Sequence, residues 1–299
     1  MRAAIVAVML VAACGGGGEG DDGGDDGGDD DGGDPFEPEM GTIAIAEQLG
    51  NWSGEAEPGA AATIRFVDGE RFPYHREAGR EGECRLLRWE PASDCGACEG
   101  VCTADGCVAW PVELDAGTLE IDGLNEAVTV VRDDYTGGYF YSPTAADVFA
   151  AGAAITARGD GGADVPAFEV TATAPLPLVT AIESPLELPH DTAFELTWTP
   201  DDPETRVHLT ISSPNAGHGA PFDTIIECAS PDDGAITIPG AYALALGVMS
   251  GRPCLVGHEC PPSTLTRYRA ARTTTDAGAV ELWLAAERVF YVSHDAPED

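Results

Sequence analysis

The sequence has no lysine, and its 15 basic residues are all arginine. A chain without lysine cannot form a Schiff base, use a Walker lysine or build a serine–lysine pair. The HExxH zinc motif, the G-x-S-x-G nucleophile elbow, the phosphate-binding loop and the dinucleotide fingerprint are missing as well. We therefore predict no catalytic residue, no metal site and no cofactor. The alternative is an extracytoplasmic hydrolase whose site is assembled only in three dimensions.

Positive charge is scarce along the whole chain. The formal net charge is −37, and 11 of the 52 acidic residues lie within residues 15–39. Residues 40–299 still carry 41 acidic and 14 basic residues, which gives them a net charge of −27. A surface this acidic repels nucleic acid and anionic lipid, so we predict no nucleic-acid partner. Cationic partners remain compatible with it.

The apolar run at the amino terminus is too short to cross a membrane, which takes about 20 residues. It covers residues 3–13 and follows Met1-Arg2, as the core of a signal peptide does. The run ends in Val11-Ala12-Ala13-Cys14, which resembles the lipobox of bacterial lipoproteins. This resemblance implies that residues 1–13 are removed as a signal peptide. It also implies that the Cys14 thiol carries a diacylglyceryl group and that the new amino terminus is acylated, commonly with palmitate.

The residue after the modified cysteine bears on the destination of the protein. In bacterial lipoproteins an aspartate at this position tends to mark retention at the inner membrane, whereas this chain has Gly15. The resemblance therefore implies a lipid anchor at the outer membrane, on its periplasmic face or at the cell surface. The membrane is thus a predicted partner through the lipid on Cys14.

Residues 14–40 are predicted to form a disordered, acidic tether. Residues 15–34 are almost wholly glycine and aspartate and cannot bury apolar surface. A glycine-rich coil of this length spans about 28 Å, and repulsion between its charges extends it further. We do not expect ordered calcium binding, because the run lacks the spacing and the final glutamate of an EF-hand loop.

The rest of the chain shows the alternation of β-strands, and we predict an all-β fold. Phe194, Leu196 and Trp198 alternate with polar residues, which is typical of a strand with one buried face. Helical periodicity is limited to residues 145–151 and 240–246. The same alternation recurs in four further runs, at residues 118–122, 168–173, 207–212 and 280–284.

Two β-sandwich domains are expected, one at 41–176 with many cysteines and one at 177–299. Between them, Pro175 and Pro177 indicate a stiff connector. The second segment has an early proline, then Leu196-Thr197-Trp198 and a charged turn into Val207-His208-Leu209. In this it resembles immunoglobulin and fibronectin type III domains. That resemblance implies a sandwich fold and no activity.

Cysteine usage favours an oxidising compartment. Each expected domain holds an odd number of cysteines, so either one disulfide joins the domains or each domain keeps a free thiol. We suggest a local Cys254–Cys260 bridge and two bridges between Cys84 and Cys107. The disulfide candidates are Cys84, Cys95, Cys98, Cys102, Cys107, Cys228, Cys254 and Cys260.

The spacing within residues 95–107 matches neither a redox helix, a zinc ribbon nor an iron–sulfur site, so structural disulfides are favoured over metal or thiol chemistry. The cysteine-rich loop runs into Trp110-Pro111. Together with the tether and the run 233–239, it resembles uncharacterised cysteine-containing lipoproteins of high-GC Gram-negative bacteria. No biochemical activity follows from this resemblance.

Aromatic and histidine side chains supply the remaining candidates for a binding site. Residues 135–141, with Gly137-Gly138 inside, are the best candidate for an exposed aromatic patch, and core packing is the alternative. His208 is expected to be solvated on the polar face of its strand, and His258-Glu259-Cys260 is more typical of a turn than of a metal site. The aromatic candidates for a carbohydrate-stacking face are Trp52, Trp89, Trp110, Tyr135, Tyr139 and Tyr141.

We therefore predict a membrane-anchored envelope or cell-surface lipoprotein. Its folded part is expected to be a non-catalytic binding, adhesion or structural module, with a glycan or a protein as partner.

Overall fold

The structure is a computed structural model of an all-β protein, as the sequence predicts. Its described part holds many strands and one short helix, α1 (Gly240–Ala245), and no helix there is long and apolar enough to cross a membrane. The predicted signal peptide, Cys14, the tether up to residue 35, Trp52, Cys254 and Cys260 lie outside it. The structure describes residues 36, 39–50, 56–69, 74–90, 92, 94–104, 106–201, 203–214, 222–250 and 262–294.

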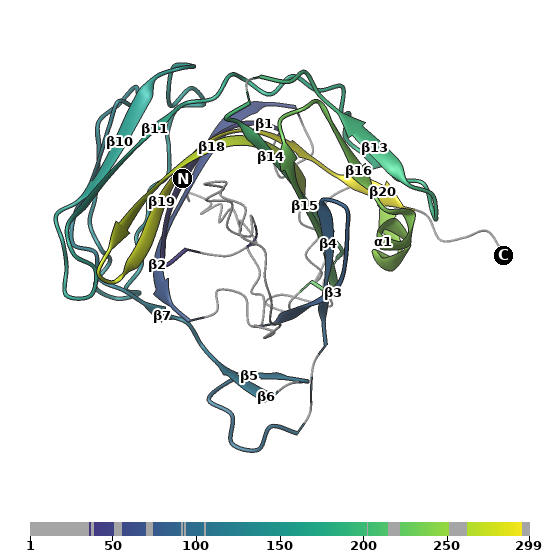
Figure 1. Ribbon diagram of the computed structural model, residues 1–299, viewed down its shortest axis with the longest axis horizontal. Coiled ribbons are helices and arrows are strands. Elements are labelled where there is room, and N and C mark those ends of the chain that lie inside the picture. The colour runs from purple at the N-terminus through teal and green to yellow at the C-terminus, as the bar shows by residue number, and fades with distance from the viewer. Residues whose placement is uncertain are drawn as a thin grey trace, which may run out of the picture.

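A strongly curved sheet of nine strands organises the molecule, as Figure 1 shows. Neighbouring strands are antiparallel except for β1 and β19, which run parallel from Gly41–Val280 to Leu49–Arg288. In spatial order the strands are β3 (His75–Glu81), β4 (Cys84–Trp89), β15 (Thr224–Pro231), β14 (Arg206–Ser212), β18 (Ser263–Thr275), β19 (Gly278–Phe290), β1 (Gly41–Leu49), β2 (Pro58–Asp68) and β7 (Val112–Glu113).

The expected division at 176/177 does not separate two sandwiches. The nine-stranded sheet takes β1 to β4 and β7 from one side of it and β14, β15, β18 and β19 from the other. Two strand pairings of this sheet join the halves: the parallel pair β1–β19 and the antiparallel pair β4–β15. Alternation within a strand shows which residues face a core but not which distant strand lies beside it, so the sequence could not reveal this pairing.

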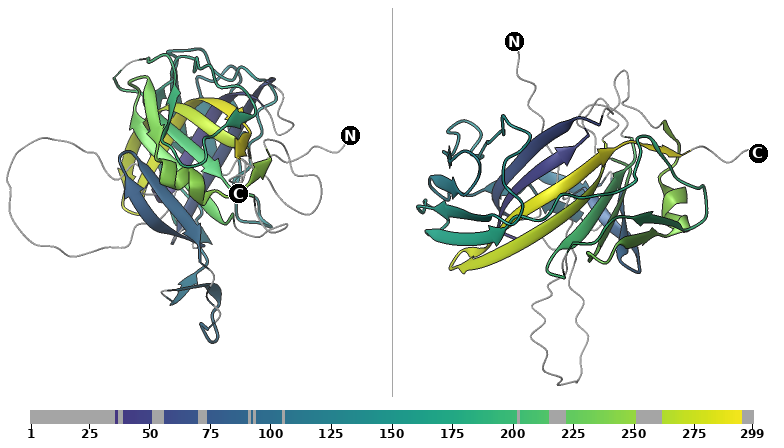
Figure 2. Two further views of the ribbon diagram at one scale, coloured as in Figure 1. Left: turned by 90° about the vertical axis from the view of Figure 1, so that its right-hand side faces the viewer. Right: turned by 90° about the horizontal axis from the view of Figure 1, so that it is seen from above.

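Smaller layers cover the convex side of the large sheet (Figures 1 and 2). A four-stranded sheet lies over one half, and a pair of strands with α1 lies over the other. A further short hairpin, β5–β6, projects from the body. The four-stranded sheet is β11 (Phe168–Thr173), β10 (Ala154–Gly159), β8 (Leu119–Asp122) and β9 (Val128–Val130). The two-stranded sheets are β13 (Phe194–Thr197) with β16 (Ala235–Ile238), and β5 (Gly100–Thr103) with β6 (Gly106–Ala109). A three-stranded sheet is formed by β12 (Leu186–Glu187), β20 (Val292–His294) and β17 (Met249–Ser250).

Two apolar cores lie between the convex face and these layers. Val280, Leu282 and Leu284 of β19 face the first core, and Leu196 and Trp198 near β13 face the second. The alternating runs in the sequence therefore identify buried residues correctly. Because one curved sheet supplies a wall of both cores, neither core is closed by one half of the chain alone.

Of the two predicted helices, only one is present. Residues 240–246 form α1 as expected, but residues 145–151 form bends. The backbone N–H groups of Val148 and Phe149 donate to the Glu47 carboxylate, and the Val148 carbonyl accepts from Asn125. Backbone groups used in these long-range bonds are not available for a helix.

Candidate functional site

The concave face of the large sheet is polar where the convex face is apolar. Residues directly opposite each other on paired strands point to the same face. The pairing places Arg85 opposite Glu227 and Glu227 opposite Thr210, and it places His208 in the neighbouring row opposite Thr266. The sheet thus gathers charged and hydroxyl side chains on one side, and this row is the first candidate site.

Arg85 and Glu227 form the centre of this row. The Arg85 Nε and Nη2 atoms both donate to Glu227 Oε2, at 2.8 and 2.5 Å. Both side chains are buried, with 1% and 0% exposed. The second carboxylate oxygen, Glu227 Oε1, has no hydrogen-bond partner in the described part of the chain, and His208 Nε2 lies 4.0 Å from it. A buried carboxylate with one unpaired oxygen is chemically the most distinctive group in the fold.

Burial sets the protonation behaviour of this pair. It raises the pKa of Glu227 to about 7, although the Arg85 guanidinium acts in the opposite direction. Burial and the nearby charge of Arg85 lower the pKa of His208 to about 4. The prediction that His208 is solvated is wrong: it lies on the polar face of β14 but is only 5% exposed. At neutral pH His208 is therefore uncharged, while Glu227 is near its titration midpoint.

The ring of Phe36 packs over the Arg85 member of this pair. Its ring centroid lies 4.0 Å from Arg85 Cζ and 5.4 Å from Arg80 Cζ, and the His208 ring is 6.1 Å away. The ring is itself buried. An arginine over an aromatic face is attracted by the ring quadrupole. Phe36, the first described residue, thus lies against the concave face.

A second polar group lies further along the same face. Glu287 Oε1 accepts from Gln48 Nε2 at 2.5 Å, and Glu287 Oε2 accepts from Thr266 Oγ1 at 2.9 Å. The pKa of Glu287 is raised, because the effect of burial is larger than that of these two hydrogen bonds, which lower it. Both carboxylate oxygens are paired, which is typical of a structural group rather than a reactive one.

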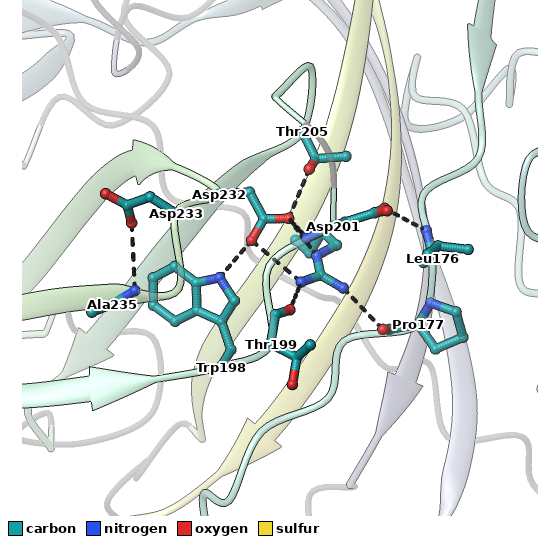
Figure 3. Close-up of polar contacts among 10 residues, drawn as sticks. Leu176, Pro177, Trp198, Thr199, Asp201, Thr205, Asp232, Asp233 and Ala235 are labelled. Carbon is teal, nitrogen blue, oxygen red and sulfur yellow. Dashed lines mark hydrogen bonds and ion pairs between the residues drawn. The ribbon is translucent and has the colours of Figure 1, made fainter.

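A third cluster, centred on Asp232, lies on the other side of the sheet (Figure 3). The carboxylate accepts from Trp198 Nε1 and Thr205 Oγ1 and pairs with Arg267 Nε at 2.8 Å. Burial would raise the pKa of Asp232, but the hydrogen bonds from Thr205, Arg267 and Trp198 outweigh it and hold that pKa below its usual range. The aspartate is therefore held as an anion.

Arg267 connects this cluster to the segment between the two halves of the chain. Its Nη1 donates to the Pro177 carbonyl at 2.9 Å, and its Nη2 donates to the Thr199 carbonyl. The Asp201 carboxylate accepts from the Leu176 N–H nearby (Figure 3). The cluster satisfies its charges internally and fixes the connector, so we assign it a structural role.

Two of the three remaining described histidines bind backbone carbonyls. His75 Nε2 lies 2.7 Å from the Phe222 carbonyl, and His294 Nδ1 lies 2.6 Å from the Gly247 carbonyl. The His294 ring stacks on His190 at 5.3 Å. Among the residues that the structure describes, no three His, Cys, Asp or Glu side chains converge as metal ligands. His258 and His218 lie outside those residues.

Six of the eight candidate cysteines form three disulfides: Cys84–Cys228, Cys95–Cys102 and Cys98–Cys107. Two bridges lie within 84–107 as suggested, but Cys84 pairs with the other half of the chain. Of the two open alternatives, a bridge between the halves is confirmed, because β4 and β15 place Cys84 directly opposite Cys228. The suggested Cys254–Cys260 bridge lies outside the described residues.

The predicted aromatic patch divides into buried and exposed members. Tyr139 is buried against Phe66, and its hydroxyl accepts from the Ala116 N–H. Tyr135 is 97% exposed and Phe140 is 63% exposed. Core packing is therefore the correct interpretation for Tyr139, and the exposed patch is correct for Tyr135 and Phe140.

These exposed residues lie on a hairpin at the edge of β2. Tyr139 bridges Ile64 of β2 and also Arg132, so the chain folds back on itself between 132 and 139. The same pairing places Val131 opposite Phe140. β7 occupies the next stretch of the same edge, with Val112 opposite Asp68.

We call this surface the aromatic edge and define it by its large exposed apolar side chains. Five of the large apolar side chains that are exposed in the described chain lie on the hairpin at residues 131–140, on β7 or just before β7. Trp110 packs edge-on against Tyr74, with 5.6 Å between ring centroids. The members of the aromatic edge are Trp110, Val112, Val131, Tyr135 and Phe140.

The patterns in the sequence identify neither Arg85 nor Glu227 as a site residue. A signal was present for Glu227, since it interrupts the run Ile225-Ile226-Glu227-Cys228-Ala229, and a lone acid in a buried strand needs a partner. Nothing local identified that partner as Arg85, which lies 142 residues away.

No protein-family model matches the chain, and no curated protein matches it.

Proposed function

We propose that the chain is an exported lipoprotein, lipidated on Cys14 and anchored at the outer membrane, whose folded part is a non-catalytic binding module. Its contact surface is the aromatic edge. The acidic tether separates this surface from the lipid, so that a partner can reach it.

The anchor is supported by the sequence and by the cysteines. Val11-Ala12-Ala13-Cys14 supplies the residues that lipidation requires, after a basic start and a short apolar run. The three disulfides in the described chain suit a protein that folds outside the reducing cytosol. One acyl chain anchors only marginally, so stable attachment takes two or more.

The exposure of Tyr135 and Phe140 carries the binding proposal. Folding normally removes large aromatic side chains from water, and each contributes strongly to a core when it is buried. Here two rings stand in solvent within six residues, and the exposed Val131 lies opposite Phe140. Clustered exposed apolar surface is typical of an interaction site, and aromatic side chains are enriched in interfaces.

A binding screen with a matched variant tests this proposal. Full-length protein in detergent micelles is applied to arrays of glycans and of envelope proteins, alongside Tyr135→Ser/Phe140→Ser. The control is Leu244→Ser, which removes an exposed apolar side chain from α1 instead. We expect at least one probe to bind the wild type and the control, and to lose about tenfold or more in affinity for the hairpin variant. Absence of binding, or equal binding by all three proteins, would contradict the proposal.

Hydrolysis is a second candidate function, and one observation favours it. Glu227 has an unpaired oxygen, a pKa of about 7 and the neutral His208 at 4.0 Å, which are properties of a general base. Its test is activity on ester, peptide and glycoside substrates, compared between wild type and Glu227→Gln. Loss of a measurable rate in the variant would support hydrolysis. Equal rates, or none in the wild type, would dismiss it.

A further inference from the structure

We propose that the partner of the aromatic edge is a basic protein segment whose arginine or lysine side chains bind over the rings of Tyr135 and Phe140. This inference rests on the proposed binding function and names the chemical class of the partner. Three features of the described residues carry it: the rigidity of the hairpin, the exposed rings, and the negative charge around them.

The turn that presents Tyr135 is rigid. The Asp133 carboxylate accepts from the backbone N–H of Tyr135 at 3.1 Å and from the backbone N–H and the hydroxyl of Thr136 at 2.7 and 2.8 Å. Arg132 Nε donates to the Gly137 carbonyl at 2.9 Å. Gly137 has a positive φ of 76°, and a Cβ there would lie 2.9 Å from Arg132 Nη2, so glycine is required.

This rigidity matters because binding loses less entropy when the contact residues are already in place. Tyr135 is at the tip of the turn and adds a large contact area with few rotatable bonds. Phe140 and Val131 lie opposite each other on the stem, where the pairing of Arg132 with Tyr139 fixes their position. The hairpin is therefore a preformed recognition element.

The charge around the rings selects a cationic partner. The hairpin, residues 131–140, contains two acidic residues and one basic residue, and residues 40–299 as a whole carry a net charge of −27. The single base, Arg132, pairs across the hairpin with the buried Tyr139 and so lies on the face opposite Val131 and Phe140. Asp133 and Asp134 come immediately before Tyr135. Cations are attracted both to an aromatic face and to nearby carboxylates.

An acidic cavity beside β7 adds to this preference. It has a volume of about 630 Å³, and its lining includes the carboxylates of Glu39, Asp68 and Asp164 with the apolar Met40 and Leu114. Asp68 is paired with Val112 of the aromatic edge. Glu39 is neutralised in part by Arg272 at 2.8 Å, but the cavity retains an excess of negative charge. The hairpin pairs with Ile64 and β7 pairs with Asp68 of the same strand, so the cavity has the volume and charge to take a basic side chain of a segment that runs along this edge from the hairpin to β7.

Partners of other classes fit these residues less well. Nucleic acid and anionic lipid are repelled by the net negative charge of the chain and by Asp133 and Asp134 beside Tyr135. A neutral glycan can stack on aromatic rings, but it gains nothing from these carboxylates. Protein segments rich in arginine satisfy both features at once, because the guanidinium group stacks on rings and pairs with carboxylates.

The experiment uses two labelled peptides, hexa-arginine and hexa-citrulline, which have similar shape but differ in charge. Fluorescence anisotropy measures the affinity of full-length protein in detergent micelles for each peptide. The hairpin variant is Tyr135→Leu/Phe140→Leu, which keeps apolar area but removes the rings. Asp134→Asn and Asp191→Asn are a matched pair, since both remove one exposed negative charge, one beside Tyr135 and one on another loop.

We expect hexa-arginine to bind at least tenfold more tightly than hexa-citrulline. The ring-free variant should lose about tenfold in affinity for hexa-arginine, and Asp134→Asn should lose more than Asp191→Asn. Equal affinity of wild type and the ring-free variant would show that net charge alone attracts the peptide, which overturns the inference. Ring-dependent binding to an uncharged array probe, with none to hexa-arginine, would overturn the cationic partner but leave the binding function intact. If no probe of either kind depends on the rings, both proposals fail.

Discussion

The effect of Glu227 on the stability of the fold depends on its partner. Its carboxylate is fully buried, and a buried charge without a counter-ion costs several kcal/mol. Arg85 supplies the counter-ion through two hydrogen bonds to one oxygen, with the Phe36 ring over its other side. The pair therefore works as a unit, and removing one member affects the other.

Replacing Arg85 alone should be strongly destabilising. We expect Arg85→Met to lower the free energy of unfolding by about 3–5 kcal/mol, because Glu227 would be left buried without its cation. The double replacement Arg85→Met/Glu227→Leu should cost less than the single one. Urea unfolding monitored by circular dichroism measures both. A loss below about 1 kcal/mol for Arg85→Met would show that the pair is not buried as described.

The opposite pKa shifts of Glu227 and His208 predict a compensated pH dependence. Glu227 has a folded pKa of about 7 against an ordinary 4.5, so its stabilising contribution is lost as pH rises from about 4.5 to 7. His208 has a folded pKa of about 4 against 6.5, so its contribution is lost as pH falls from about 6.5 to 4. Between about pH 4.5 and 6.5, the contribution of Glu227 to the free energy of unfolding falls as pH rises, while that of His208 increases.

Removing the histidine should therefore reveal how the free energy of unfolding varies with pH through Glu227 alone. In His208→Gln, the free energy of unfolding should fall between pH 4.5 and 7 more steeply than in wild type, by about 1 kcal/mol per pH unit. Urea unfolding at four pH values in this range checks it. Parallel curves for wild type and variant would mean that the two groups do not titrate as their burial requires.

Among the structural elements, the buried residues of β8, β11, β13, β14 and β19 could be predicted from the sequence, but the strands that lie beside them could not. Phe194, Leu196 and Trp198 alternate with polar residues, and Leu196 and Trp198 are buried as this pattern requires. The partners of β1 and β4 are 239 and 142 residues away along the chain, as the Gln48–Glu287 and Arg85–Glu227 contacts show. The candidate site depends on those partners, so patterns within a single strand could not predict it.

The disulfides should contribute unequally to stability, because they close loops of different lengths. Cys84–Cys228 spans 144 residues and joins β4 to β15, whereas Cys95–Cys102 spans 7 residues. Replacing both cysteines of the long bridge by alanine should lower the free energy of unfolding by about 2 kcal/mol more than the same change at the short bridge. Urea unfolding of the two double variants gives the comparison. Equal losses would contradict the role of the long bridge.

For the whole molecule, the single curved sheet explains why one surface is available for binding. Its convex face is covered by two layers, and its concave face buries charged pairs. The edge beyond β2 is only partly covered, by β7 and the hairpin, and Val112, Val131, Tyr135 and Phe140 are exposed there. The proposed lipid on Cys14 and the acidic tether would hold the molecule at a membrane while leaving a spacer between the two.

Lipidation predicts a specific behaviour of the complete protein. Wild type expressed in a Gram-negative host should lack residues 1–13, carry acyl chains on Cys14 and enter the detergent phase on Triton X-114 partitioning. Cys14→Ser should retain the leader and carry no lipid, while the control Cys254→Ser should behave like wild type. Intact-protein mass spectrometry reads all three. A wild-type product that begins with Met1 or stays in the water phase would contradict the anchor.

The shared sheet is the feature on which the site, the aromatic edge and the stability predictions all depend. Peptide mapping of the unreduced protein by mass spectrometry tests it most directly, because the Cys84–Cys228 bridge forms only where β4 lies beside β15. We predict a linked peptide joining Cys84 to Cys228, with Cys95–Cys102 and Cys98–Cys107 as separate pairs. A product in which Cys84 is linked within residues 95–107, or Cys228 to Cys254 or Cys260, would show two independent halves and contradict the single sheet.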